Sequence, residues 1–159
     1  MGNNRNRKPG NETADSHAQL AHRLKSDLTH DIVYYTSATG SAPARDFLAT
    51  CPPKVRAHIM AVAVAVAQAP PKRFAGGGYW EAMHGTMTGW FEIRSDGPGK
   101  RTHFRIFCLL DTEAAGTDLP LLVLVAGLKK TKGSIFSERE YSAIRELGED
   151  YFAQNPRRL

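Results

Sequence analysis

From Tyr79 to Leu128 the apolar residues recur at about every second position, in runs that are separated by turn-forming residues. A period of two is typical of β-strands that bury one face, and short links between such runs predict an antiparallel meander. The links hold Gly85, then an Asp-Gly-Pro-Gly turn that ends at Gly99, then Gly116. Strands are therefore expected at Tyr79–His84, Gly89–Ser95, Arg101–Leu110 and Leu121–Leu128.

The segment before this meander predicts one strand and two helices. Ile32–Tyr35 is rich in residues that favour strands. Pro43 suits the first turn of a short helix, which the Cys-Pro-Pro motif at 51–53 ends. The last proline of that motif begins a run with apolar residues at helical spacing, which stops at Pro70. Residues 61–67 also alternate as a strand does, but the length of the run and its lack of turn residues favour a longer helix.

A final helix is predicted from Ser137, because Glu140 follows three residues later and the two form a capping box. Its buried stripe consists of Tyr141, Ile144, Leu147 and Tyr151. The complete order is one strand, two helices, four strands and one helix. This order predicts an α+β fold with an antiparallel-rich sheet of about five strands, two N-terminal helices packed on one face, and a C-terminal helix.

The length of 159 residues suits one modest domain with flanking segments. We place the domain at residues 31–153 and a tail at 154–159. Residues 1–30 are rich in Asn, Arg, Lys, His and Ser, and they predict a disordered or weakly helical basic leader. Three leucines spaced four apart within the leader leave a docking arm for a partner as the alternative.

Charge and cysteine usage limit the partner and the compartment. The chain has 21 Lys and Arg against 16 Asp and Glu, a formal charge of +5, so a polyanion is an expected partner. Cys51 and Cys108 lie among apolar residues, as small core side chains do in a reducing compartment. No run approaches the roughly 20 apolar residues of a membrane span. We therefore expect a cytoplasmic protein that needs no membrane, metal or cofactor.

Strand alternation gathers basic side chains on one surface of the expected sheet, which we call the basic face. Its members are Glu92, Arg94, His103 and Arg105, with Lys129, Lys130 and Lys132 at the edge where the last strand ends. A hairpin that buries the apolar residues of the second and third meander strands must expose these side chains together. Guanidinium and ammonium groups at this density suit phosphodiester oxygens. The alternative is a solvated surface with cross-strand salt bridges such as Glu92 with Arg105.

The succession of motifs resembles the phage-derived, HigB-type branch of the RelE toxin superfamily. The motifs are Pro-Ala-Arg-Asp-Phe-Leu at 43–48, Gly-Trp-Phe-Glu-Ile-Arg at 89–94, Phe-Arg-Ile-Phe at 104–107, Gly-Leu-Lys-Lys-Thr-Lys at 127–132, and the capped helix. The resemblance covers about Ile32 to Tyr151 and implies a RelE-like fold. The chain departs from the family pattern after Lys132 and in an insertion at Thr112–Leu119.

This resemblance implies the toxin of a type II toxin–antitoxin system. Such a toxin is a metal-independent endoribonuclease, an mRNA interferase that cleaves mRNA on the ribosome and inhibits translation. The implied partner is a cognate helix-turn-helix antitoxin, which would also connect the toxin to operator DNA. Arg94 and Arg105 match the strand arginines of the family's active face, and Lys129 and Lys130 match its Lys-Lys-Thr motif.

RNA can be cut by its own 2′-hydroxyl, so the protein must help to move protons and must stabilise charge on the phosphoryl oxygens. We expect Arg94, Arg105 and Lys130 to hold the phosphate. His103 is the expected proton carrier, although an exposed strand histidine without a role is the alternative. Further proton candidates are His84 and Glu92. RNA contacts are expected from Lys100, Arg101, Lys129, Lys132 and Trp90, while Tyr79, Trp80 and Trp90 either stack on bases or fill the core.

Two other classes of function stay open on the sequence alone. ParE-like toxins of the same superfamily poison DNA gyrase, and in such a toxin the basic face would serve for binding only. A non-catalytic, phage-derived interaction protein would also fit the residues.

Overall fold

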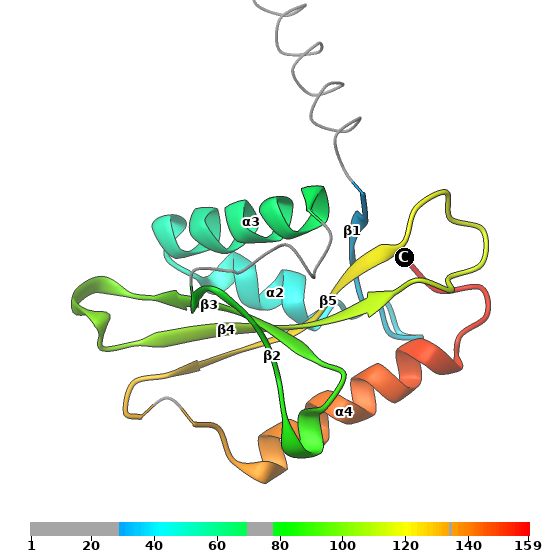
Figure 1. Cartoon of the computed structure of the whole chain (residues 1–159). Helices are drawn as coiled ribbons and strands as arrows, with labels where there is room; N and C mark the ends of the chain where they lie inside the picture. The colour runs from blue at the N-terminus through cyan, green and yellow to red at the C-terminus, as the bar shows by residue number, and fades with distance from the viewer. Residues whose placement is uncertain (1–28, 70–77, 134) are drawn as a thin grey trace, which may run out of the picture.

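The computed structural model describes residues 29–69, 78–133 and 135–159, so the predicted leader lies almost wholly outside the described residues. These residues form an α+β fold with a five-stranded mixed sheet and three α-helices (Figure 1). The elements are β1 (Asp31–Tyr34), α2 (Pro43–Thr50), α3 (Pro53–Gln68), β2 (Trp80–Ala82), β3 (Phe91–Asp96), β4 (His103–Asp111), β5 (Leu121–Lys130) and α4 (Glu138–Ala153). No helix within these ranges has the length and apolar character that crossing a membrane requires.

The sheet has the strand order β1-β5-β4-β3-β2. Its last four strands in the sequence form the antiparallel meander that the alternation predicts, whereas β1 pairs with β5 in parallel and makes the sheet mixed. The apolar β5 lies between β1 and β4 and is buried on both faces, as a central strand should be. The first meander strand is shorter than expected, because a 3₁₀ turn at Gly85–Met87 follows it closely.

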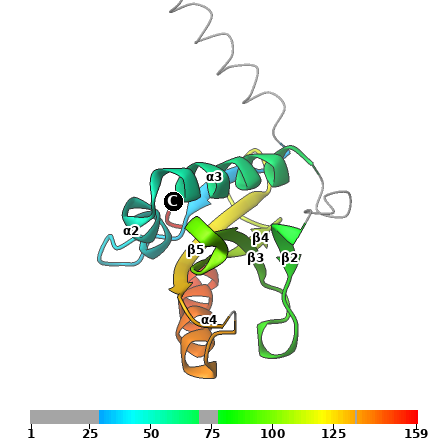
Figure 2. The same cartoon turned by 90° about the vertical axis from the view of Figure 1, so that its left-hand side faces the viewer.

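The helices lie on both faces of the sheet. The expected fold placed the two N-terminal helices on one face but did not place the C-terminal helix on the other. α2 and α3 cover one face, and α4 covers part of the other (Figure 2). Residues 61–67 belong to α3, which confirms the helical interpretation over the strand. The capping box of α4 is also confirmed, with the Ser137 backbone amide donating to Glu140 Oε2 at 2.7 Å.

Each face of the sheet builds its own core. Toward α2 and α3 the buried residues include Ile93, Phe104 and Ile106, and toward α4 they include Trp90 and Phe107. The two helix layers approach the sheet closely at glycines. An added Cβ at Gly127 of β5 would lie 2.0 Å from Phe47 Cδ1, and one at Gly148 of α4 would lie 2.4 Å from Trp90 Cζ2.

Residues after α4, expected as a tail, pack back on the domain. Asp111 at the end of β4 is buried, and its Oδ2 accepts hydrogen bonds from Tyr151 and from Arg157 Nε, both at 2.9 Å. Burial alone would raise the pKa of Asp111, but these donors, led by Arg157, outweigh it and hold the pKa below its ordinary value. Gln154 and Arg157 of the expected tail therefore pack against the domain, while Leu159 at its end is exposed.

Candidate active site

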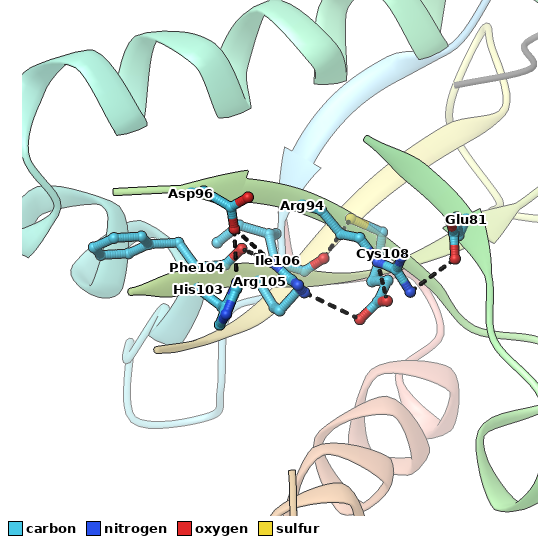
Figure 3. A network of polar contacts seen from close by, with 9 residues as sticks. Glu81, Arg94, Asp96, His103, Phe104, Arg105, Ile106 and Cys108 are labelled. Atoms are coloured by element: carbon cyan, nitrogen blue, oxygen red, sulfur yellow. Dashed lines mark hydrogen bonds and ion pairs between the residues drawn. The ribbon is translucent and has the colours of Figure 1, made fainter. Parts of the chain in front are cut away.

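The register of β3, β4 and β5 places the predicted polar side chains on the face of the sheet that α4 partly covers. Arg94 pairs directly with Arg105, and His103 pairs with Asp96 on one side and Lys130 on the other. Opposed residues share a face, and so do alternate residues of one strand. Arg94, His103 and Arg105 are therefore brought together as the alternation predicted, and Asp96 joins them from the end of β3 (Figure 3).

The charges of this face are balanced, which corrects the expectation of a cationic surface. Arg94 Nε lies 2.6 Å from Glu92 Oε1, and Arg94 Nη2 lies 2.7 Å from Glu81 Oε2. Arg105 lies between two carboxylates at the longer distance of 3.9 Å, with Nε toward Glu92 and Nη1 toward Asp96. Two guanidiniums are thus paired with three carboxylates. This face therefore has the cross-strand salt bridges of the alternative interpretation and is not an unpaired cationic surface.

The side chains of this network differ in how far they are exposed to solvent. The side chain of Arg94 is 36 % exposed, whereas Arg105 is 8 % and Glu92 is 9 % exposed. Burial lowers the pKa of Arg105, the nearby Glu92 carboxylate opposes this effect, and Arg94 adds to it. A guanidinium pKa is so high that Arg105 keeps its charge at neutral pH. Arg94 is therefore the more accessible of the two cations, and Arg105 is a fixed charge beneath it.

His103 has the geometry of an oriented proton carrier. Its Nδ1 lies 2.8 Å from Asp96 Oδ1, and its side chain is partly buried. A carboxylate hydrogen-bonded to one ring nitrogen fixes the orientation of the ring and leaves the other nitrogen to face a substrate. The sequence pattern predicts a turn at Asp96, but this residue belongs to β3 and completes the pair with His103.

The lysines do not act as one group. Lys130 shares the face of Arg105, and its ammonium donates to the Ile135 carbonyl and lies 5.7 Å from the Phe136 ring centroid. Lys129 pairs with Phe104 and so points to the α2 and α3 side. The expectation that both lysines line the same face is wrong, because β5 continues through Lys130 and adjacent strand residues point in opposite directions.

The other predicted RNA-binding cations lie at the edges. Lys100 and Arg101 are exposed in the turn between β3 and β4, and Lys132 is exposed after β5. Lys100 borders a different cavity, of about 860 Å³, between the start of α3 and that turn. His58 lines the same cavity and bonds to Ser95 Oγ at 2.9 Å. The turn residues therefore flank the network without joining it.

The aromatic candidates are not arranged to stack on a base at the network. Trp90 is 7 % exposed and packs against Gly148 of α4, which favours the core alternative for this side chain over a role in stacking on RNA. Trp80 is buried and stacks on Phe91 at 4.8 Å. Tyr79 is exposed, but its ring meets His58 on the α3 side.

A pocket of about 380 Å³ adjoins Arg94 on the side of β2. It is lined by Glu81, His84, Thr86, Glu92, Arg94, Glu138 and Tyr141, together with neighbouring small and apolar residues. The sequence reasoning missed Glu81 and Tyr141 here. Residues 80–82 are too few for alternation to show on which face of the sheet Glu81 lies. Only the pairing of β2 with β3 places Glu81 opposite Glu92.

No grouping of three or more His, Cys, Asp or Glu side chains with the arrangement of a metal site occurs in residues 29–69, 78–133 and 135–159. Both cysteines are buried and free. No model of a known protein family matches the chain, and comparisons with curated proteins and with solved structures found no significant match. The polar network of β2, β3 and β4 is the candidate site that follows from the contacts above.

Proposed function

We propose that this chain is a toxin of the RelE/HigB type that cleaves mRNA on the ribosome as a metal-independent endoribonuclease, and that its fold is RelE-like. The observation that carries the proposal is the juxtaposition of Arg94, Arg105 and the His103–Asp96 pair on one sheet face. The order of one strand, two helices, four strands and one helix also agrees with the resemblance of the sequence to that superfamily. A helix-turn-helix antitoxin and, through it, operator DNA are the proposed partners.

The proposed reaction uses these groups in defined roles. The 2′-hydroxyl attacks the adjacent phosphorus, the bond from phosphorus to the 5′ oxygen breaks, and a cyclic phosphate and a 5′-hydroxyl end result. His103, oriented by Asp96, takes or gives the proton that this exchange requires. Arg94 and Arg105 stabilise the charge that develops on the phosphoryl oxygens, with Lys130 at the edge of the site.

Binding must rearrange the ion pairs of the free protein. Glu81 holds Arg94 from the short edge strand β2 and is itself about half exposed, so an incoming phosphate can displace it. Arg105 needs no such exchange, because its neighbours are farther away. A bound phosphate would thus contact Arg105 in its existing position and would replace Glu81 as the partner of Arg94.

Arg94→Ala and Arg105→Lys test the proposal. Arg105→Lys is the better variant at the buried position, because it keeps a cation beside the buried Glu92, whereas alanine would leave Glu92 with Arg94 alone. Loss of one preorganised donor typically costs about 3 kcal/mol, on the order of a hundredfold in rate, and lysine lacks the planar fork. Both variants should therefore cleave a ribosome-bound message about a hundredfold more slowly. Arg56→Ala, on the opposite helix layer, is the matched control and should cleave normally.

Controlled expression in bacteria decides between the classes of function. Growth arrest with new mRNA 5′ ends at ribosome-protected codons supports the proposal, and rescue by a neighbouring helix-turn-helix protein supports the antitoxin partner. Growth arrest with broken DNA and intact mRNA would assign the chain to the gyrase-poisoning toxins. Normal growth with soluble, folded protein would remove the toxin proposal altogether.

A further inference from the structure

We propose that Glu92 is a positioning residue, one carboxylate that holds the guanidiniums of Arg94 and Arg105 so that both address the same phosphate. This inference rests on the proposed function and deepens it, because the role belongs to the same site. Glu92 would not touch the RNA. It would act through the two arginines.

The geometry places Glu92 between the two cations. It precedes Arg94 by two positions on β3, and its pairing with Phe107 sets it diagonally next to Arg105 on β4. Each carboxylate oxygen faces a different arginine, Oε1 toward Arg94 Nε at 2.6 Å and Oε2 toward Arg105 Nε at 3.9 Å. A single side chain therefore spans both strands.

The position needs such a carboxylate for electrostatic reasons. Arg94 and Arg105 are directly opposed, and like charges in opposed positions repel. Glu92 itself is almost fully buried, and a buried carboxylate is costly unless cations neutralise it. The Glu92 carboxylate and the two guanidiniums therefore offset one another's charge. Glu81 and Asp96 are about half exposed and each touches one arginine, so neither can replace Glu92 as the bridge.

The bridge also determines which nitrogens remain for a ligand. Glu92 accepts a hydrogen bond from Arg94 Nε and faces Arg105 Nε at 3.9 Å, an ion-pair distance. Arg94 Nη2 faces Glu81, and Arg105 Nη1 donates to the Phe104 carbonyl at 3.0 Å. Among the described residues, Arg94 Nη1 and Arg105 Nη2 have no hydrogen-bond partner. The hydrogen bond from Nε to Glu92 fixes the plane of Arg94, while Arg105 is held by its bond to the Phe104 carbonyl and by the charge of Glu92 at 3.9 Å. The two unpaired donors would then keep a constant direction toward a bound phosphate.

Glu92→Gln separates positioning from simple charge. The variant keeps the shape but loses the charge that holds both arginines. Misplacing a group that acts in the transition state lowers kcat, and we expect a fall of about tenfold to a hundredfold on a ribosome-bound message. KM should stay level or fall, because removing a negative charge cannot weaken the attraction of the surface for RNA. An unchanged kcat, or a kcat and KM that rise together, would overturn the proposal.

Glu146→Gln is the matched control, since it removes a carboxylate from an exposed position of α4 that does not line the pocket. Its kcat should equal that of the parent. Glu92→Asp keeps the charge on a side chain one methylene shorter, so it reaches one arginine but not both. Its kcat should lie between those of the parent and Glu92→Gln, and this variant carries the test if glutamine prevents folding. A parent-like kcat for Glu92→Asp in that case would overturn the proposal.

The Nε–H signals of Arg94 and Arg105 in ¹⁵N NMR spectra give a readout that does not depend on cleavage. In the parent both signals should be sharp and exchange slowly with water, and in Glu92→Gln both should broaden or disappear. If the parent protein does not cleave RNA, the proposed function fails, whereas these signals still decide whether Glu92 orders the arginines. Unchanged signals in folded Glu92→Gln would reject the positioning role whatever the enzyme assay shows.

Discussion

Gly148→Ala tests how α4 packs on the sheet and whether Trp90 is truly a core residue. On an open helix surface this substitution stabilises a protein by about 1 kcal/mol, because glycine loses more backbone entropy on folding. At Gly148, however, the new Cβ would lie 2.4 Å from Trp90 Cζ2 and 2.9 Å from Cη2. Carbon atoms prefer roughly 3.5–4 Å, so the helix or the indole must move by about 1 Å.

The indole has little freedom to move, since it is buried against the α4 side of the sheet with Leu109 nearby. Overpacking of this kind costs about 1–3 kcal/mol, and the severity of the clash favours the upper end. After the gain in helix propensity the net loss should be about 2 kcal/mol. For a protein of this size that corresponds to a fall in Tm of about 4–8 °C.

Urea denaturation followed by circular dichroism measures the change in the free energy of unfolding. Glu146→Ala, at an exposed position of the same helix, is the control and should change stability by less than about 0.5 kcal/mol. Trp90→Phe removes Cζ2 and Cη2, so the double variant should be more stable than the sum of the single effects by about 1 kcal/mol or more. If Gly148→Ala is as stable as the parent, α4 does not press on Trp90, and the indole returns as a candidate for RNA stacking.

The remaining predictions also concern contacts that join distant parts of the chain. Gly127→Ala should be more damaging than Gly148→Ala, since its Cβ would overlap Phe47 at 2.0 Å, and Phe47→Leu should restore part of the stability in the same denaturation assay. Asp111→Asn should lose about 2 kcal/mol at neutral pH by weakening the bond from Arg157, with Arg157→Lys expected to lose less. The folded-state pKa of Asp111 is lowered, so its carboxylate contributes its full stability only above the ordinary carboxyl pKa of 3.8. The difference in unfolding free energy between Asp111→Asn and the parent should therefore be largest above that pH and should shrink as the pH falls below it. A loss that persists unchanged at pH 2 would assign the effect to packing instead.

The sequence predicted the central part of the candidate site because strand alternation has a fixed period. Arg94 and Arg105 had to share a face once both apolar sets were buried, and the register confirms it. Lys129 and Lys130 were grouped wrongly because no turn residue or other local pattern marks where β5 ends. Hydrogen bonding to β4 extends β5 by two residues beyond the predicted Leu128, and the pleat then separates the two lysines.

The charge balance of the site could not be read from the order of residues. Glu81 lies on a three-residue strand, and its contact with Arg94 exists only because β2 pairs with β3. Trp90 has the alternation of an exposed residue, yet α4 covers it because Gly148 allows a close approach. Both features depend on side chains that are far apart in the chain.

The sequence by itself determined the α+β class, the meander, the capped final helix and the face that carries the two arginines, because each follows from local periodicity, capping or turn chemistry. Only the tertiary structure decided how that face is charged and how much of it is exposed. Ion pairs and burial depend on which elements meet across the sheet, and that pairing is set by the packing of the whole core. The anchoring of residues 154–159 through Arg157 and Asp111 has the same origin, since 46 positions separate the partners and no local pattern connects them.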